Sequence, residues 1–117
     1  MSSKIKSQNF QIDEVIPWEY ASPGIQRKVF GYDNQIMLVK VRFEQGAIGS
    51  IHEHIHSQVS YVESGVFEIT NGDEKRTLNA GDGFCATPHT LHGAICIEAG
   101  VLIDVFSPPR EDFLLLK

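Results

Sequence analysis

Turn-forming residues divide this sequence into segments that are too short for most helices but long enough for β-strands. Asn71-Gly72 and the cluster at residues 80–83 (Ala-Gly-Asp-Gly) separate runs rich in valine, isoleucine and phenylalanine. No 12-residue window has a convincing helical period. Many short strands at near-regular spacing are typical of a β-sandwich or β-barrel, so we expect an all-β fold.

The expected strands follow from this punctuation. They are residues 25–32, 36–43, 59–62, 66–70, 76–79, 84–87, 94–98 and 101–106. In 36–43, Met37 and Val39 alternate with Lys40 and Arg42, which predicts a half-buried strand. We expect turns at 63–65 and 71–72, and a last hairpin that joins 94–98 to 101–106 across 99–100.

Composition places the chain among single-domain globular proteins. Its 117 residues suffice for one domain, with residues 1–20 as an N-terminal arm and 21–117 as a β-barrel with a C-terminal tail. A formal net charge of -5 argues against nucleic acid and anionic membrane surfaces as partners. No apolar run reaches the ~18 residues of a membrane span, and the first residues lack the apolar core of a signal peptide.

The two cysteines bear on the compartment. Cys85 and Cys96 both fall inside expected strands, and neither has a CxxC partner. We therefore interpret both as small buried hydrophobic side chains. Two unpaired cysteines fit a reduced cytoplasm, which is the expected location.

The strand at 101–106 is apolar on both faces. Val101, Ile103 and Val105 lie on one face, and Leu102 and Phe106 on the other. A strand with one face in water normally alternates with polar residues, so a neighbouring segment or a second subunit must cover this one. The arm at 10–18 and the tail at 113–117 are also apolar. We expect a two-fold homodimer in which the N-terminal arm packs across the interface.

The segment 46–65 concentrates the chemistry of the chain. His52, His54, His56 and Gln58 stand at alternate positions, which share one face in an extended strand. A straight strand rises ~3.3 Å per residue and would separate His52 from Gln58 by roughly 20 Å. A turn at 55–57 would instead put His56 near the loop tip and Gln58 beside His54. We expect His52, His54 and Gln58 to bind a metal ion; the alternative is a solvated, histidine-rich hairpin without metal.

A second cluster lies between Gly81 and His92. His92 follows a turn bounded by Pro88 and begins a strand, so we expect it to be the fourth ligand. His89 is expected to be solvated or to support the ligands from outside. Three imidazoles and one amide suit a single divalent ion of nickel, zinc, manganese, cobalt or iron.

Together these stretches resemble the cupin family. The first cupin motif is matched by Gly46, His52, His54, Gln58 and Gly65, with glutamine in place of the usual glutamate. The second is matched by Gly81, by Pro88 one place late, and by His92, whereas its usual glycine and asparagine fall on His89 and Cys96. The resemblance implies a small RmlC-like jelly-roll barrel with the metal inside, often dimeric.

The C-terminal segment 104–113, DVFSPPREDF, resembles that of the KdgF-type cupins of pectin degradation. This narrower resemblance implies ring opening and ketonisation of 4,5-unsaturated uronate monomers, released from pectin or alginate, to the linear 4-deoxy-5-keto uronate. A small sugar acid would then be the partner. Asp104, Phe106 and Arg110 match positions that this subgroup uses at its site.

The residues themselves allow two interpretations of each position. Asp104 shares a strand face with Phe106, and we expect it to be a general acid and base in the barrel interior or, alternatively, a hydrogen-bonded structural carboxylate. Arg110 follows two prolines and can pair bidentately with a substrate carboxylate, or with Glu111 or Asp112 at the surface. Phe106 either packs against the sugar or fills the core.

Two other functions remain open, because a fold does not fix an activity. One is a non-catalytic cupin that binds a small sugar or another metabolite. The other is a cupin oxygenase, or an isomerase of different specificity. Replacement of Asp104 without loss of function would favour the binding protein, and oxygen consumption would favour the oxygenase.

Overall fold

In the computed structural model, which describes residues 5–114, the chain is all-β, as expected. The strands are β1 (Glu19–Ser22), β2 (Ile25–Tyr32), β3 (Met37–Phe43), β4 (Ile48–His52), β5 (Ser57–Asn71), β6 (Glu74–Asn79), β7 (Gly83–Ala86) and β8 (His92–Ser107). Two single 3₁₀ turns, η1 (Asp13–Val15) and η2 (Glu111–Leu114), accompany them. Neither is long and apolar enough to span a bilayer, and residues 5–114 contain no other helix.

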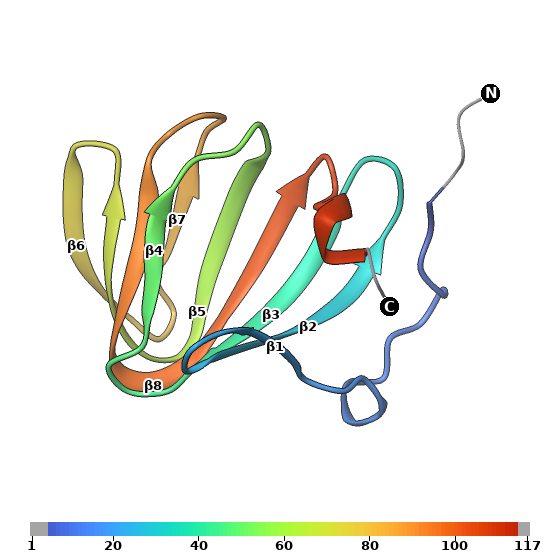
Figure 1. Ribbon diagram of the computed structural model, residues 1–117, viewed down its shortest axis with the longest axis horizontal. Helices are drawn as coiled ribbons and strands as arrows, with labels where there is room; N and C mark the ends of the chain where they lie inside the picture. Colours follow the sequence, from blue (N-terminus) through green and yellow to red (C-terminus); the bar gives the residue numbers. More distant parts are fainter. Residues whose placement is uncertain (1–4, 115–117) are drawn as a thin grey trace.

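Two long strands hold the jelly roll together. The strand order is β1-β2-β3-β8-β5-β6, with β4 paired to β8 and β7 paired to β5. The first half of β8 pairs with β4 and the second half of β5, whereas the second half of β8 pairs with β3 and the first half of β5. Figure 1 shows both strands curving from one wall of the molecule to the other. Within the described residues the order does not close into a complete barrel.

The expected hairpin at 99–100 and the expected turn at 63–65 are wrong. Residues 92–107 form one strand and residues 57–71 another, and the ladder between them is irregular from Val62 to Phe67. Gly65 has a φ of +84°, and a Cβ on it would meet the carbonyl oxygen of Glu98 at 2.6 Å. A Cβ on Gly100 would come closer still to the carbonyl oxygen of Ser64. The two glycines let adjacent strands bend together, which is why they resemble turn signals in the sequence.

The inner faces of the strands form the core. On β3, Met37, Val39 and Phe43 are buried, and Arg42 on the opposite face is exposed, which confirms the predicted alternation. Phe43 meets Phe67 edge to face with ring centroids 5.1 Å apart. A second cluster of Met37, Val39 and Phe106 extends this core towards the site described below.

The described part of the arm lies against its own chain. The backbone N–H of Ser7 donates to the carbonyl oxygen of Tyr32 at 2.9 Å. Nζ of Lys28 donates to the carbonyl oxygen of Asp13 at 2.7 Å. The arm thereby helps to bury this lysine on the outer face of β2. Trp18 packs beneath the guanidinium of Arg42, 4.2 Å from its ring centroid. Packing of the arm across a dimer stays a prediction, and residues 115–117 of the expected tail lie outside the described residues.

The cysteines differ in their surroundings. Cys96 is buried at 1% exposure, as expected. Cys85 is exposed, so its predicted burial is wrong. It stands opposite Val59 on β5, and both side chains point to the outside of the sheet. The sequence pattern predicts that neighbouring residues of β7 point to opposite faces, but it does not say which of the two faces meets the core.

Candidate metal centre and its cavity

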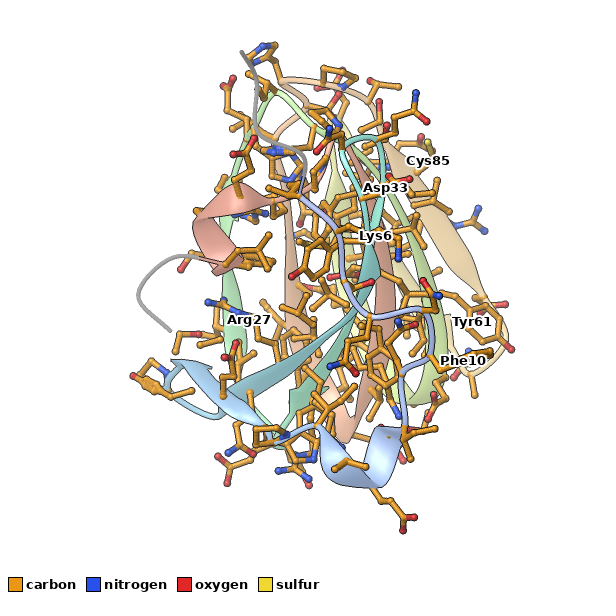
Figure 2. The ribbon with its side chains drawn as sticks, turned by 90° about the vertical axis from the view of Figure 1, so that its right-hand side faces the viewer. Lys6, Phe10, Arg27, Asp33, Tyr61 and Cys85 are labelled. Atoms are coloured by element: carbon orange, nitrogen blue, oxygen red, sulfur yellow. The ribbon has the colours of Figure 1, made fainter. Side chains whose placement is uncertain are left out.

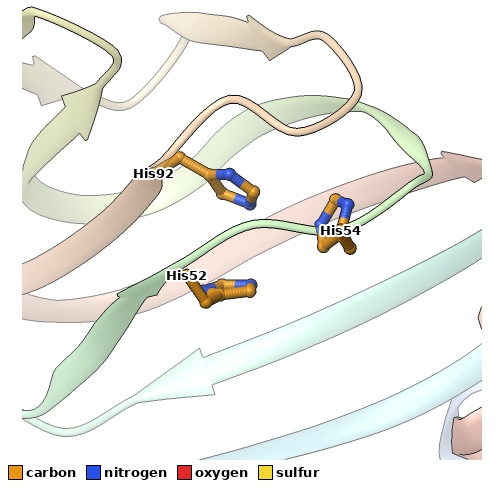
Figure 3. Close-up of side chains that lie close together, drawn as sticks. All are labelled: His52, His54 and His92. Carbon is orange, nitrogen blue, oxygen red and sulfur yellow. The ribbon is translucent and has the colours of Figure 1, made fainter.

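Three histidines from two strand ends meet at one point of the fold. His52 ends β4, His54 follows in the loop, and His92 begins β8, where it pairs with His52 across the ladder. One ring nitrogen from each lies within 4.8 Å of the others, and Figure 3 shows the three rings gathered together. These distances allow the three side chains to share one ion.

The other ring nitrogen of each histidine is fixed by the backbone. Nδ1 of His52 and Nδ1 of His92 each lie 2.8 Å from the carbonyl oxygen two residues earlier. Nδ1 of His54 lies 3.0 Å from the carbonyl oxygen two residues later. Because a carbonyl oxygen only accepts, each Nδ1 carries the proton and each Nε2 keeps its lone pair.

Gln58 brings a fourth acceptor to the same point. It lies one residue after the start of β5, is 6% exposed, and holds Oε1 3.1 Å from Nε2 of both His54 and His92. The loop therefore turns back as the spacing predicts and places Gln58 beside His54.

This donor set fits a cation. Burial lowers the pKa of His54 and of His92, so both imidazoles stay neutral near pH 7. The lone pairs of Nε2 and of Oε1 of Gln58 then face one another without a proton between them. A divalent ion at this point would convert their mutual repulsion into coordination by neutral N and O ligands. The grouped histidines of this chain thus make a metal site.

A hydrogen-bonded chain links Gln58 to the buried carboxyl group of Asp104. Nε2 of Gln58 donates to Oγ of Ser60 at 2.9 Å, and this hydroxyl donates to Oδ1 of Asp104 at 2.6 Å. Ser60 is 2% exposed and stands directly opposite Asp104 in the ladder of β5 and β8. Ser60 therefore turns the amide oxygen of Gln58 towards the histidines while it holds the carboxyl group.

Asp104 has the acidity of a proton-transfer group. Burial raises its pKa to about 6, although the hydrogen bond from Ser60 and the charge of Arg110 act in the opposite direction. The expected placement of Asp104 and Phe106 on one interior face is confirmed, since they are 8% and 3% exposed. The alternative of a hydrogen-bonded carboxyl group also describes Asp104, and the two properties are compatible.

A cavity of about 360 Å³ joins these groups. Its lining includes His52, Gln58, Asp104, Phe106 and Arg110. The cavity therefore brings together residues from the histidine segment and from the C-terminal segment, which lie about half the chain apart in the sequence.

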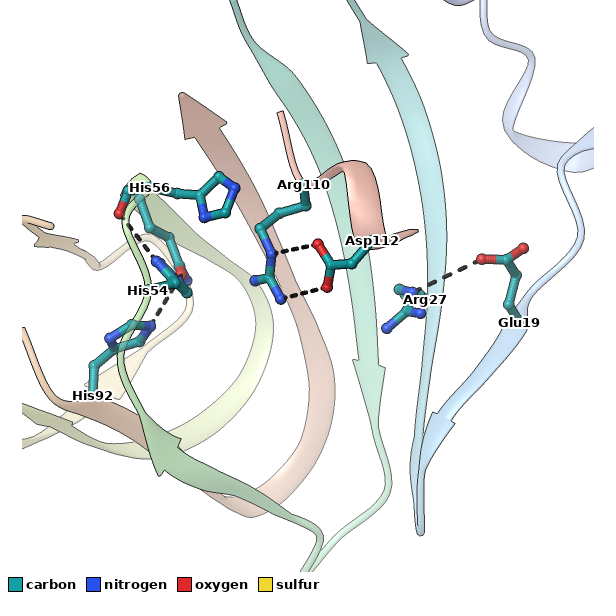
Figure 4. A network of polar contacts seen from close by, with 8 residues as sticks. Glu19, Arg27, His54, His56, His92, Arg110 and Asp112 are labelled. Carbon is teal, nitrogen blue, oxygen red and sulfur yellow. Dashed lines mark hydrogen bonds and ion pairs between the residues drawn. The ribbon is translucent and has the colours of Figure 1, made fainter. Parts of the chain in front are cut away.

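Arg110 pairs with Asp112, one of the two partners predicted for the alternative without substrate. Nε and Nη2 donate to the two carboxylate oxygens of Asp112 at 3.1 and 3.0 Å, a bidentate pair visible in Figure 4. Its side chain is only 16% exposed, and the guanidinium lies over the rings of Phe106 and Phe113. A guanidinium has five N–H groups, so this pairing leaves further donors.

The two remaining histidines of this region lie beside the three grouped histidines. The ring of His56 packs against those of His54 and Phe106, with centroids 5.2 and 6.3 Å apart, and burial lowers its pKa. His89 is exposed, and its backbone N–H donates to the carbonyl oxygen of His54 at 2.8 Å. Its ring pairs with Glu53.

Arg27 and Ser60 escaped the sequence analysis. Arg27 lines the same cavity from β2, on the interior stripe that also carries Ile25 and Val29. A charged residue at a strand position that alternation assigns to the apolar face could have indicated that Arg27 faces the interior. Ser60 offered none, because a serine in a strand is ordinary and its partners become visible only in three dimensions.

Comparison with known proteins places the chain in a family. Residues 39–106 match the cupin domain family, and the chain belongs to this family. Within it, the chain is similar to the pectin degradation protein KdgF of Dickeya dadantii (strain 3937). The two are 45% identical over 109 residues, which are 92% of this chain and 99% of that relative.

Two solved structures agree with this placement. An RmlC-like cupin from Shewanella frigidimarina superposes with a TM-score of 0.90 at 44% identity, covering 92% of this chain and 97% of its own. KdgF from Halomonas sp. superposes with a TM-score of 0.87 at 42% identity, covering 92% and 99%. The resemblance to cupins of the KdgF type is therefore confirmed.

Proposed function

We propose that this chain is an isomerase-type enzyme that opens and ketonises 4,5-unsaturated uronate monomers from pectin or alginate. The product is the linear 4-deoxy-5-keto uronate. The observation that carries the proposal is the 45% identity, over nearly the whole of both chains, to a pectin degradation protein. The cavity supports it, because one space holds acceptors for a cation, a buried carboxyl group and a guanidinium.

His52, His54, Gln58 and His92 would hold one divalent ion, of nickel, zinc, manganese, cobalt or iron. Held by four neutral ligands, the ion would keep its full charge and stabilise negative charge that develops on substrate oxygen. The polypeptide fixes these ligands in advance, through the backbone carbonyls that bind Nδ1 and through Ser60.

Asp104 is assigned to proton transfer. Ring opening removes the proton of the anomeric hydroxyl, breaks the bond from the anomeric carbon to the ring oxygen, and returns a proton to that oxygen. Ketonisation then moves the enol proton to the neighbouring carbon, with no net oxidation. With a pKa of about 6, Asp104 can accept and give back one proton near neutral pH.

Phe106 and Arg110 position the substrate in this proposal. Phe106 offers an apolar wall at 3% exposure beside the carboxyl group of Asp104. The free donors of Arg110 bind an anionic oxygen of the uronate. Phe106 also belongs to the core cluster, so in this proposal one ring both fills the core and packs against the sugar.

A time course by NMR tests the activity. The metal-loaded protein is mixed with 4,5-unsaturated galacturonate, and the loss of the cyclic form is compared with buffer. We expect faster loss and signals of the 4-deoxy-5-keto product, both abolished in Asp104→Asn. A rate equal to buffer with metal bound would reduce the protein to a metal-binding cupin, and oxygen uptake would indicate an oxygenase.

The outer face of the sheet supports a homodimer. Val59 and Tyr61 on β5 are 53% and 52% exposed and stand directly opposite Val105 and Ile103 on β8. Figure 2 shows Tyr61 at the outside of the sheet, away from Arg27. Adjacent apolar side chains of this kind mark an association surface. Tyr61→Asp should convert a dimer to a monomer in light scattering, whereas Ile48→Asp, at an exposed position on β4 outside the arm, should not; a monomeric wild type would remove the proposal.

A further inference from the structure

The cavity contains a second guanidinium, that of Arg27. The side chain comes from β2, where Arg27 stands between the apolar residues Ile25 and Val29 on the face that lines the cavity. It is 23% exposed. Figure 4 shows Arg27 and Arg110 on either side of Asp112, at the end of the site away from His92. Two cations therefore stand at one end of the cavity, and the acceptors for the metal ion stand at the other.

Both guanidiniums lie against the ring of Phe113. Arg27 is 4.0 Å and Arg110 is 4.3 Å from its centroid. Phe113 belongs to η2, so the C-terminal turn packs over the cationic end. Stacking fixes the plane of each guanidinium but does not use its N–H donors, which point outward from its edge.

The two arginines differ in how their donors are used. Arg110 gives two N–H groups to Asp112, as described above. Nε of Arg27 is buried without a hydrogen-bond partner, and the oxygen of Glu19 that forms its ion pair is 3.8 Å away. This separation exceeds hydrogen-bond length. Figure 4 shows this Nε on the side of Glu19, so the donors of Arg27 left for a ligand in the cavity are its Nη N–H groups, which have no hydrogen-bond partner among the described residues.

We propose that Arg27 binds the carboxylate of the uronate and so sets the orientation of the sugar in the cavity. This inference rests on the proposed function. An unsaturated uronate has one carboxylate at one end and hydroxyl oxygens at the other. With its carboxylate on Arg27, beside Arg110, the sugar presents its hydroxyl oxygens to the histidine end and to Asp104. Arg27 thereby selects acidic sugars over neutral sugars of the same shape.

The test measures binding apart from turnover. Metal-loaded wild type, Arg27→Met and Arg27→Lys are titrated with galacturonate and with galactose, and affinity is followed by NMR. We expect Arg27→Met to weaken galacturonate by about tenfold or more and to leave galactose unchanged. Arg27→Lys should fall between, because it keeps the charge and loses the planar fork. On the unsaturated uronate, Arg27→Met should raise KM more than it lowers kcat.

Two variants separate this role from a structural one. Arg42→Met removes an arginine that also lies over an aromatic ring but stands outside the cavity, and it should bind both sugars like the wild type. Glu19→Gln removes the ion pair and should keep galacturonate affinity. Equal loss of both sugars in Arg27→Met, unchanged galacturonate affinity in it, or a wild type that binds no galacturonate would overturn the proposal. If the wild type shows the expected selectivity but no turnover, the proposed activity fails and the role of Arg27 stands.

Discussion

The two ends of the cavity are built by different means. At the histidine end, every ring has its Nδ1 fixed by a carbonyl oxygen, and Gln58 is fixed by Ser60. At the arginine end, two guanidiniums rest on one ring, and one of them has an unused donor. The first end is preorganised for a small ion that demands short distances. The second is suited to a larger anion that tolerates adjustment.

The largest expected effect concerns the ligands of the histidine end. His52→Ala should lose bound metal, because it removes one of the converging Nε2 acceptors while His52 itself is exposed and contributes little to the core. Metal analysis after dialysis measures this. His89→Ala is the matched control, since its ring lies outside the ligand set, and it should keep its metal. An unchanged metal content in His52→Ala would remove His52 from the ligands.

The next effect concerns proton transfer. Asp104→Asn should keep its metal and fold but lower kcat by ~10²–10⁴-fold, the usual contribution of a general acid or base. In the wild type, kcat/KM should change with pH near the pKa of about 6. Turnover, metal content and circular dichroism are measured on the same sample. A fully active Asp104→Asn protein would end the assignment.

Ser60 connects the predicted metal ligand Gln58 to the carboxyl group of Asp104, so its loss should weaken the positioning of both groups. Ser60→Ala should lower metal affinity by ~10–100-fold, as is usual for removal of a group that orients a ligand. Competition with a chelator measures the affinity. Ser64→Ala removes another strand hydroxyl, which accepts from Val101, and should not change metal binding. Equal affinity in both variants would show that Gln58 is oriented without Ser60.

Arg110 should give a smaller change. Arg110→Lys retains the charge but loses the bidentate pair with Asp112 and the stacking on Phe106. We expect KM to rise by several-fold with kcat nearly unchanged, since the interaction positions the ground state and transition state alike. Steady-state kinetics with the unsaturated uronate decide this. Identical kinetics would show that Arg110 serves only the C-terminal turn.

The smallest effect is on stability. Because burial raises the pKa of Asp104 from 3.8 to about 6, the folded state holds this proton more tightly than the unfolded state. In the metal-free protein, the stability gained from binding this proton is fully present below pH 3.8, the pKa in the unfolded state. It is lost as the pH rises through about 6, the pKa in the folded state. Metal-free Asp104→Asn should therefore gain in Tm relative to wild type, by a few degrees, between pH 4 and pH 7. A difference in Tm that does not vary with pH would contradict this.

Local patterns predicted the parts of the site that lie close together in the chain. The spacing of His52, His54 and Gln58 required a return of the chain at 55–57, and β5 begins there. The two-residue spacing of Asp104 and Phe106 likewise predicted one shared interior face.

Features that depend on distant partners could not be predicted in this way. Gly65 and Gly100 look like turn residues in the sequence. Each is needed because β5 and β8 approach each other closely at this point, which leaves no room for a side chain. The exposure of Cys85 depends on which face of β7 meets the core. Arg27 becomes meaningful only when β2 is seen to line the same cavity as His52.

The most direct test of metal-dependent proton transfer in this protein compares the wild type in three states. The rate of loss of 4,5-unsaturated galacturonate is followed by NMR with metal-loaded, metal-stripped and reloaded wild type, each beside Asp104→Asn. We expect a rate above buffer in the loaded and reloaded wild type, and the buffer rate in the stripped protein and in every Asp104→Asn sample. A stripped protein that keeps full activity, or a loaded wild type at the buffer rate, would contradict this expectation.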